Sequence, residues 1–169
     1  MRFLRTPACA LGLVLVVVAI VAAQVDRRPP GDDKVGASLA LQVAGAPYQF
    51  SGKASCTHDA KAGMFGVVGE KWQVVHSEGP RSLILNFMKP TNGTGDMFSL
   101  SVESGGKSYE VDTLKARPSD AVKGSGTVSL APSGKGGTFT IDAKAENGAK
   151  ISGTIKCDAF TTRAAVAGN

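Results

Sequence analysis

The residues whose types could perform chemistry gather in one short segment, Cys56-Thr57-His58-Asp59. Thiolate, imidazole and carboxylate groups all bind transition metals, so His58, Asp59 and the later His76 are candidate ligands of a metal site. Thioethers favour Cu(I), and three of them follow the segment: Met64, Met88 and Met97. The chain has only 2 histidines, and they belong to different predicted elements. We therefore expect surface histidines, core methionines and no resident metal or other cofactor.

A nucleophilic active site is not recognisable in the sequence. Hydrolases need a nucleophile beside an oriented base. Gly124-Ser125-Gly126 has neither the Gly-x-Ser-x-Gly spacing nor the strand, turn and helix of a nucleophile elbow. No pair of carboxylates lies in an apolar setting that would separate their pKa values. The sequence therefore predicts a protein that is not an enzyme; a pocket joining His76 to a carboxylate and a hydroxyl is the alternative.

Cys56 and Cys157 end two similar segments, Phe50-Ser51-Gly52-Lys53-Ala54-Ser55-Cys56 and Ile151-Ser152-Gly153-Thr154-Ile155-Lys156-Cys157. Two cysteines in an exported chain predict a disulfide. The bridge would close a loop of about 100 residues, and loop-closure entropy would then stabilise the fold by about 4 to 5 kcal/mol. Both cysteines share the strand face of their apolar neighbours, so we expect a buried bridge and adjacent first and last main strands.

The first 23 residues have the features of a signal peptide. Arg2 and Arg5 precede an uncharged apolar run, and Val21-Ala22-Ala23 provides the small residues that a signal peptidase reads. We expect cleavage after Ala23 and a secreted, periplasmic or cell-envelope location. An uncleaved anchor over residues 8–25 is the alternative, because that stretch is near the lower length limit for spanning a bilayer.

The remaining chain is predicted to form one domain between two flexible segments. Residues 24–35 contain charges, prolines and glycine and read as a linker, residues 36–160 form the domain, and residues 161–169 form a disordered tail. The net charge of +5 falls to about +3 without Arg2 and Arg5. Basic residues are dispersed singly, which disfavours nucleic acid. We expect a protein or small-molecule partner, and no membrane span once the signal is cleaved.

Apolar residues alternate with polar ones along most of the domain, at the period of a half-buried strand. Glu78-Gly79-Pro80, Ser104-Gly105-Gly106 and Asn147-Gly148 separate these runs as turns. The count is about nine strands without a helical period. The sequence predicts an all-β protein, an antiparallel two-layer β-sandwich or alternatively a flattened β-barrel.

Three stretches fall outside this alternation. Residues 57–70 read as a long loop or as a short helix followed by a turn, and residues 114–121 read as a crossover loop. Because long loops on a rigid scaffold often carry function, both are expected binding surfaces. Asn92-Gly93-Thr94 is a glycosylation sequon in a predicted turn, with chance occurrence as the alternative.

Three motifs near the ends of the domain carry a family resemblance: Ser51-Gly52-Lys53-Ala54-Ser55-Cys56-Thr57, Ala62-Gly63 and Ile155-Lys156-Cys157. They are similar to motifs of the mycobacterial lipoprotein antigen family of small secreted β-proteins. The similarity covers the terminal strands, and the lipidated cysteine that members carry after the signal has no counterpart here. The resemblance implies a disulfide-linked β-fold of the cell envelope without an enzymatic site.

The sequence thus predicts an exported, disulfide-stabilised β-protein that binds a partner or has a structural role in the envelope or extracellular space. A metal or small-molecule carrier is the alternative.

Overall fold

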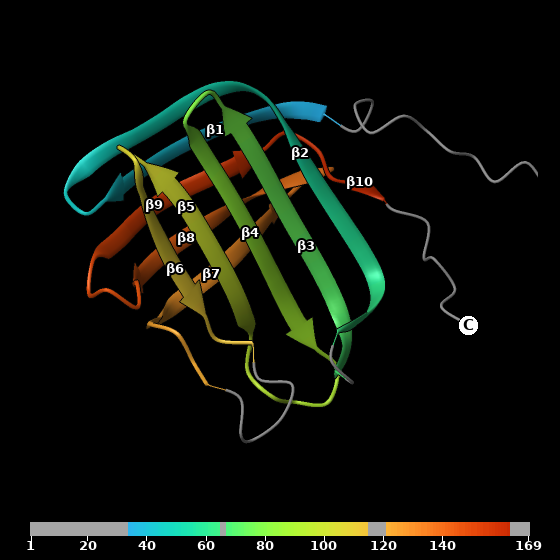
Figure 1. Cartoon of the computed structure of the whole chain (residues 1–169). Coiled ribbons are helices and arrows are strands. Elements are labelled where there is room, and N and C mark those ends of the chain that lie inside the picture. Colours follow the sequence, from blue (N-terminus) through green and yellow to red (C-terminus); the bar gives the residue numbers. More distant parts are fainter. Residues whose placement is uncertain (1–33, 65–66, 115–120, 163–169) are drawn as a thin grey trace, which may run out of the picture.

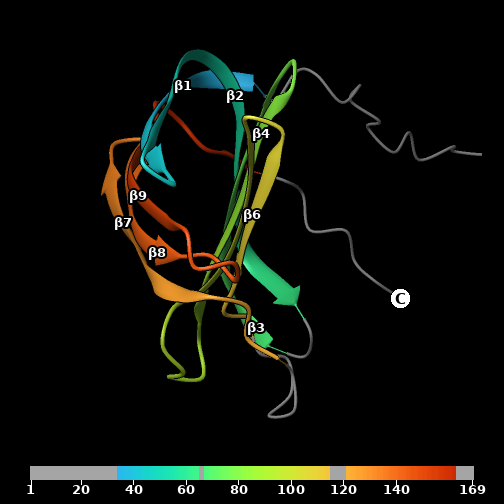
Figure 2. The ribbon, with the colours of Figure 1, turned by 60° about the vertical axis from the view of Figure 1, so that its left-hand side comes forward.

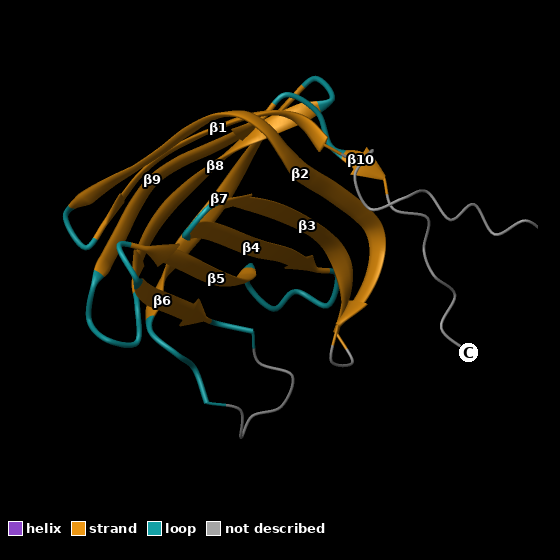
Figure 3. Cartoon of the chain, turned by 45° about the horizontal axis from the view of Figure 1, so that its top comes forward, coloured by secondary structure: helices purple, strands orange, loops and turns teal. Residues whose placement is uncertain are grey.

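A computed structural model describes residues 34–64, 67–114 and 121–162 of the chain. The predicted signal peptide, most of the predicted linker and residues 163–169 of the predicted tail lie outside these residues. The described residues form strands and connecting turns (Figure 3). None of them belongs to a helix that could cross a membrane.

The described residues form ten strands in succession. In order they are β1 (Lys34–Val43), β2 (Ala46–Met64), β3 (Val67–Glu78), β4 (Arg81–Pro90), β5 (Met97–Ser104), β6 (Lys107–Asp112), β7 (Ser125–Ser133), β8 (Gly136–Lys144), β9 (Lys150–Cys157) and β10 (Thr161–Thr162).

Nine of these strands form one continuous sheet in the order β6-β5-β4-β3-β2-β1-β9-β8-β7. Each strand pairs antiparallel with the strands next to it in this order. The sheet curls so that β3 to β6 face the wall formed by β1 and β7 to β9 (Figures 1 and 2). The long strand β2 bends from one wall to the other (Figure 1). The predicted all-β antiparallel fold is confirmed. Because both walls belong to one sheet, the molecule is a nearly closed barrel, which was the predicted alternative to a two-layer sandwich.

The two ends of the sheet meet at a seam beside β6. Asp112 and Lys123 exchange backbone hydrogen bonds, with N···O distances of 2.7 and 3.0 Å. The Lys123 ammonium lies 3.0 Å from a Glu110 carboxylate oxygen and 3.9 Å from one of Glu146. The hydrogen bond to Glu110 raises the pKa of Lys123, so the ammonium stays charged at the seam. These contacts hold Lys123, which lies just before β7, against Asp112, the last residue of β6.

Alternating side chains fill the barrel interior, as β1 illustrates. Ala37, Leu39, Leu41 and Val43 are buried, whereas the residues between them are exposed. Burying an aliphatic or aromatic side chain of this kind contributes about 1.5 to 3 kcal/mol. In the part of the chain that the structure describes, the largest fully buried side chains are Tyr48, Phe87, Phe139, Leu39, Leu41, Leu83, Leu85, Met88, Leu100, Ile141, Ile151 and Ile155.

The predicted disulfide joins β2 to β9, the two neighbours of β1. Cys56 and Cys157 are bonded with a Cα–Cα distance of 6.3 Å, and both are essentially inaccessible. The ladder between β1 and β2 begins at the pair Lys34 and Ser55, so Cys56 lies just beyond the start of β1. Cys157, by contrast, pairs with Ala37 inside β1, so the bridge runs from the end of the β1–β2 ladder to a residue within the β1–β9 ladder. The predicted burial of the bridge is confirmed, and the two strands that carry the matched motifs, β2 and β9, lie on either side of β1, which pairs with both.

Three local expectations were wrong. Residues 57–64 and 67–70 belong to β2 and β3, not to a loop or helix. Lys34 and Val35 of the predicted linker begin β1, and Thr161 and Thr162 of the predicted tail pair in parallel with β2.

Candidate functional site

A cluster of aromatic and basic side chains occupies the corner where β2 leaves β3. The His76 side chain is buried, and its Nδ1 lies 2.9 Å from the Tyr48 hydroxyl. The Phe50 ring lies against the imidazole with a centroid separation of 3.9 Å. The Arg81 guanidinium covers the Tyr48 ring at 4.4 Å and donates a hydrogen bond of 3.0 Å to the Gln49 carbonyl. The cluster closes the interior at a point where the two strands no longer pair.

Burial controls the protonation of this corner. It raises the pKa of Tyr48 and lowers the pKa of His76, because burial penalises the charged form of each side chain. Both groups are therefore neutral near pH 7. When the proton is on Nε2 of His76, the Tyr48 hydroxyl donates to Nδ1 and the buried Nε2 has no partner among the described residues. The expectation of a surface histidine was wrong at position 76.

His58 belongs to a separate cluster at the cross-strand pair that it forms with Trp72. The imidazole stacks on the indole with a centroid separation of 4.5 Å and an interplanar angle of 8°. Its Nε2 lies 3.2 Å from a Glu70 carboxylate oxygen. The Lys89 ammonium lies 5.9 Å from the centroids of both the Trp72 and the Phe87 rings. His58 thus covers an aromatic core residue while remaining partly exposed.

The three candidate metal ligands do not converge. Trp72, the partner of His58, precedes His76 by four residues on β3, so the two histidines are separated by roughly 13 Å along the strand. Asp59 pairs with Lys71 across the ladder, and its buried Oδ1 has no hydrogen-bond partner in the described part of the chain. Across residues 34–64, 67–114 and 121–162, no three His, Cys, Asp or Glu side chains are grouped to hold an ion.

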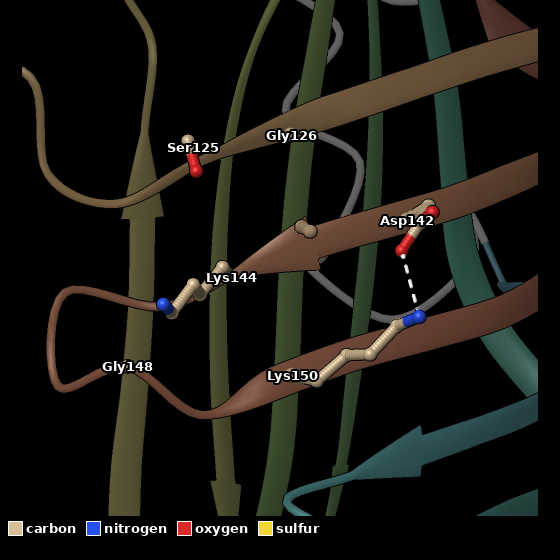
Figure 4. A pocket seen from close by; sticks show the side chains of 7 residues that line it. Ser125, Gly126, Asp142, Lys144, Gly148 and Lys150 are labelled. Carbon is tan, nitrogen blue, oxygen red and sulfur yellow. Dashed lines mark ion pairs between the residues drawn. The ribbon is translucent and has the colours of Figure 1, made fainter.

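A hollow with a volume of about 410 Å³ lies on the outer face of β7, β8 and β9 (Figure 4). It is lined by Ser125, Gly126, Asp142, Ala143, Lys144, Gly148 and Lys150. A side chain at Gly126 would overlap Ala143, so the glycine lets β7 lie close to β8 beneath the hollow. The rim is therefore formed by one hydroxyl, one carboxylate and two ammonium groups.

The charges of the hollow are unevenly paired. The Lys150 ammonium lies 3.5 Å from an Asp142 carboxylate oxygen, as the dashed line in Figure 4 marks. Lys144 has no ion pair among the described residues and extends along the β8–β9 connection near Gly148 (Figure 4). The arrangement leaves one cation beside the Ser125 hydroxyl, a combination suited to an anionic ligand that also carries hydroxyl groups.

No pattern in the sequence predicted this hollow. Its polar side chains alternate with buried residues in β8 and β9, which is the pattern of any wet sheet face. The glycines of Gly124-Ser125-Gly126 and Asn147-Gly148 were the only local signal, since glycines inside or beside strands often mark close backbone approach. Of the expected binding surfaces, residues 57–70 belong largely to strands, and residues 115–120 lie outside the described residues.

Comparison of the chain with protein families, with characterised proteins and with solved structures found no match.

Proposed function

We propose that this protein is an exported, disulfide-stabilised barrel that acts by binding, or as a structural component, in the cell envelope or extracellular space. The observation that supports this most is the buried bridge between Cys56 and Cys157. Structural disulfides form and persist in oxidising compartments and are rare in the cytosol. A disulfide-linked envelope β-fold is also what the resemblance to the mycobacterial lipoprotein antigen family implies.

Export is tested by comparing the full chain with a variant that lacks residues 1–23 in the cells that produce the protein. We expect the full chain outside the cytosol, with Cys56 and Cys157 resistant to alkylation even after the chain is unfolded in denaturant. The truncated variant should remain in the cytosol with both thiols alkylated. A full chain that stays in the cytosol with reactive thiols would contradict the proposal.

The hollow on β7 to β9 favours a second candidate, the carriage or recognition of a small anionic molecule. Its volume of about 410 Å³ lies within the range of about 300 to 1,000 Å³ that ligand sites occupy. Lys144 supplies the cation and Ser125 a hydrogen-bonding hydroxyl, while Lys150 is already paired with Asp142. An acidic sugar combines the anionic and hydroxyl groups that match these side chains.

This second candidate is tested by titrating the isotopically labelled protein with glucuronate and, in parallel, with neutral glucose. We expect glucuronate alone to shift the backbone resonances of the residues that line the hollow. Lys144→Gln should abolish these shifts, whereas Lys53→Gln, which removes an exposed lysine of β2, should leave them intact. Equal shifts in both variants would place binding elsewhere.

A further inference from the structure

Two Asn-Gly dipeptides lie in exposed turns of the barrel. Asn92-Gly93 belongs to the connection between β4 and β5, and Asn147-Gly148 belongs to the connection between β8 and β9. In such dipeptides the glycine nitrogen can attack the asparagine carboxamide carbon, because glycine has no side chain to hinder the approach. Both glycines have a left-handed backbone, with φ values of 79° and 85°. Sequence and exposure alone therefore give the two sites similar reactivity.

The two carboxamides differ in their hydrogen bonds. Asn92 Oδ1 accepts one hydrogen bond of 3.1 Å from the Thr94 backbone N–H and a second of 2.6 Å from the Thr94 hydroxyl. Asn147 Oδ1 accepts a single hydrogen bond of 3.1 Å, from the Ala149 backbone N–H. Donors on a carbonyl oxygen stabilise the negative charge that develops as a nucleophile adds to its carbon. Two hydrogen bonds thus activate the Asn92 carboxamide towards nucleophilic attack, whereas one activates that of Asn147.

The two attacking nitrogens also differ. The Gly148 N–H donates a hydrogen bond of 2.8 Å to the Ala145 carbonyl, which holds this nitrogen in the hairpin. Within the described residues the Gly93 N–H donates no hydrogen bond, and the space around the Gly93 Cα is open. Attack by Gly93 therefore breaks no hydrogen bond of the turn, whereas attack by Gly148 has to break one.

We propose that Asn92 is a self-modification site that converts to aspartate and isoaspartate, and that the fold protects Asn147 from the same reaction. A bond forms between the Gly93 nitrogen and Cγ of Asn92, the Cγ–Nδ2 bond breaks, and ammonia leaves with the proton of the Gly93 nitrogen. Water then adds to either carbonyl of the resulting cyclic imide and opens it to aspartate or isoaspartate. The reaction needs only water and replaces a neutral amide with a carboxylate in an exposed turn.

The same residues form the glycosylation sequon Asn92-Gly93-Thr94. A glycan on Nδ2 would remove the leaving group and block the imide, so the two fates of Asn92 exclude each other. They are distinguished by mass, because deamidation adds the difference between a carboxylic acid and a carboxamide whereas a glycan adds whole sugar units.

The test incubates the folded, disulfide-bonded full chain in ¹⁸O-water at neutral pH and measures label incorporation at each asparagine by peptide mass spectrometry. We expect Asn92 to convert several-fold faster than Asn147. After reduction and denaturation the two rates should converge, because the turn hydrogen bonds are lost. Equal rates in the folded protein, faster conversion of Asn147, or a glycan on Asn92 in the protein isolated from its own cells would overturn the proposal.

Two variants test the role of the Thr94 hydroxyl. Thr94→Val should slow conversion of Asn92 by about two- to tenfold. This is the change in rate expected when the barrier rises by the free energy of one exposed hydrogen bond. Thr94→Ser retains a hydroxyl at the same position and should keep most of the wild-type rate. A rate in Thr94→Val equal to that of the wild type would contradict the activation by Thr94, and the rate at Asn147 in each variant serves as the internal control.

Discussion

His76 shows how far the sequence determines the environment of a single side chain. It alternates with exposed or half-buried residues along β3 and shares the interior face with Trp72 and Val74, contrary to the expected surface position. Its partner Tyr48 is 28 positions away in the sequence. No local pattern in the sequence predicts the contact between Tyr48 and His76, because it forms only where β2 bends away from β3. The metal-ligand interpretation failed for the same reason, since residue types alone do not say which side chains a curled sheet brings together.

The buried His76 predicts a loss of stability in acid. Burial, aided by the Arg81 and Lys34 charges and opposed by Glu78, holds the pKa of His76 below its ordinary value of 6.5. As the pH falls below about 6.5, the unfolded chain binds a proton before the folded chain does. The contribution of His76 to the free energy of unfolding should therefore be constant above that pH and should decrease below it.

Urea unfolding at a series of pH values measures this effect. His76→Gln should flatten the decrease between pH 6.5 and more acidic values, because glutamine does not titrate. His58→Gln, at the partly exposed histidine, is the matched control and should retain the decrease. An unchanged acid profile in the His76 variant would disprove the assignment.

At the scale of the element, the sequence predicts a strand well where one of its faces is buried. The turns at Gly79-Pro80, Gly105-Gly106 and Asn147-Gly148 lie where they were expected. The second half of β2 was missed because residues 57–64 show no apolar alternation and contain a register shift between Asp59 and Ala62. Residues 57–64 form a strand because their backbone pairs with β3 and β10, although their sequence has no regular apolar pattern.

Gly153 in β9 illustrates an element that depends on a missing side chain. Its φ of 135° is one that other residues rarely adopt, and a Cβ there would overlap the Ala40 carbonyl oxygen of β1. Gly153→Ala should therefore lower the free energy of unfolding by about 1 to 3 kcal/mol.

Chemical denaturation of Gly153→Ala and Gly95→Ala provides the comparison. Gly95 lies in a connection with open space around it and an ordinary φ, so its replacement should change stability by less than about 0.5 kcal/mol. Similar losses in the two variants would mean that the contact between β1 and β9 is not tight at Gly153.

At the scale of the whole molecule, the matched motifs that end in Cys56 and Cys157 predicted the covalent link and the adjacency of the strands that carry them, which lie as β2 and β9 on either side of β1. They did not predict the sheet order or the seam between Asp112 and Lys123. Those depend on pairings between strands distant in the sequence, which the local alternation of apolar residues does not encode. The same alternation fits a sandwich and a barrel. The sequence therefore predicted two facing layers of strands, but it did not predict that both layers belong to one continuous sheet.

The bridge should account for a large share of the global stability. It closes a sequence separation of 101 residues, for which loop-closure entropy gives about 4 to 5 kcal/mol. Cys56→Ser should lose about this amount of unfolding free energy in guanidinium titrations. The double variant Cys56→Ser with Cys157→Ser should lose little more than the single one, because both remove the same bond. Stability equal to that of the wild type would show that the bridge does not constrain the unfolded chain.

We propose above all that the protein works outside the cytosol with β2 and β9 joined by the disulfide between Cys56 and Cys157. Mass spectrometry of the protein isolated from its own cells, alkylated without reduction and then mapped by proteolysis, tests it most directly. The account predicts an N-terminus at Gln24, a linked peptide pair containing Cys56 and Cys157, and no alkylated cysteine. An N-terminus that still includes residues 1–23, together with alkylated Cys56 and Cys157, would contradict it.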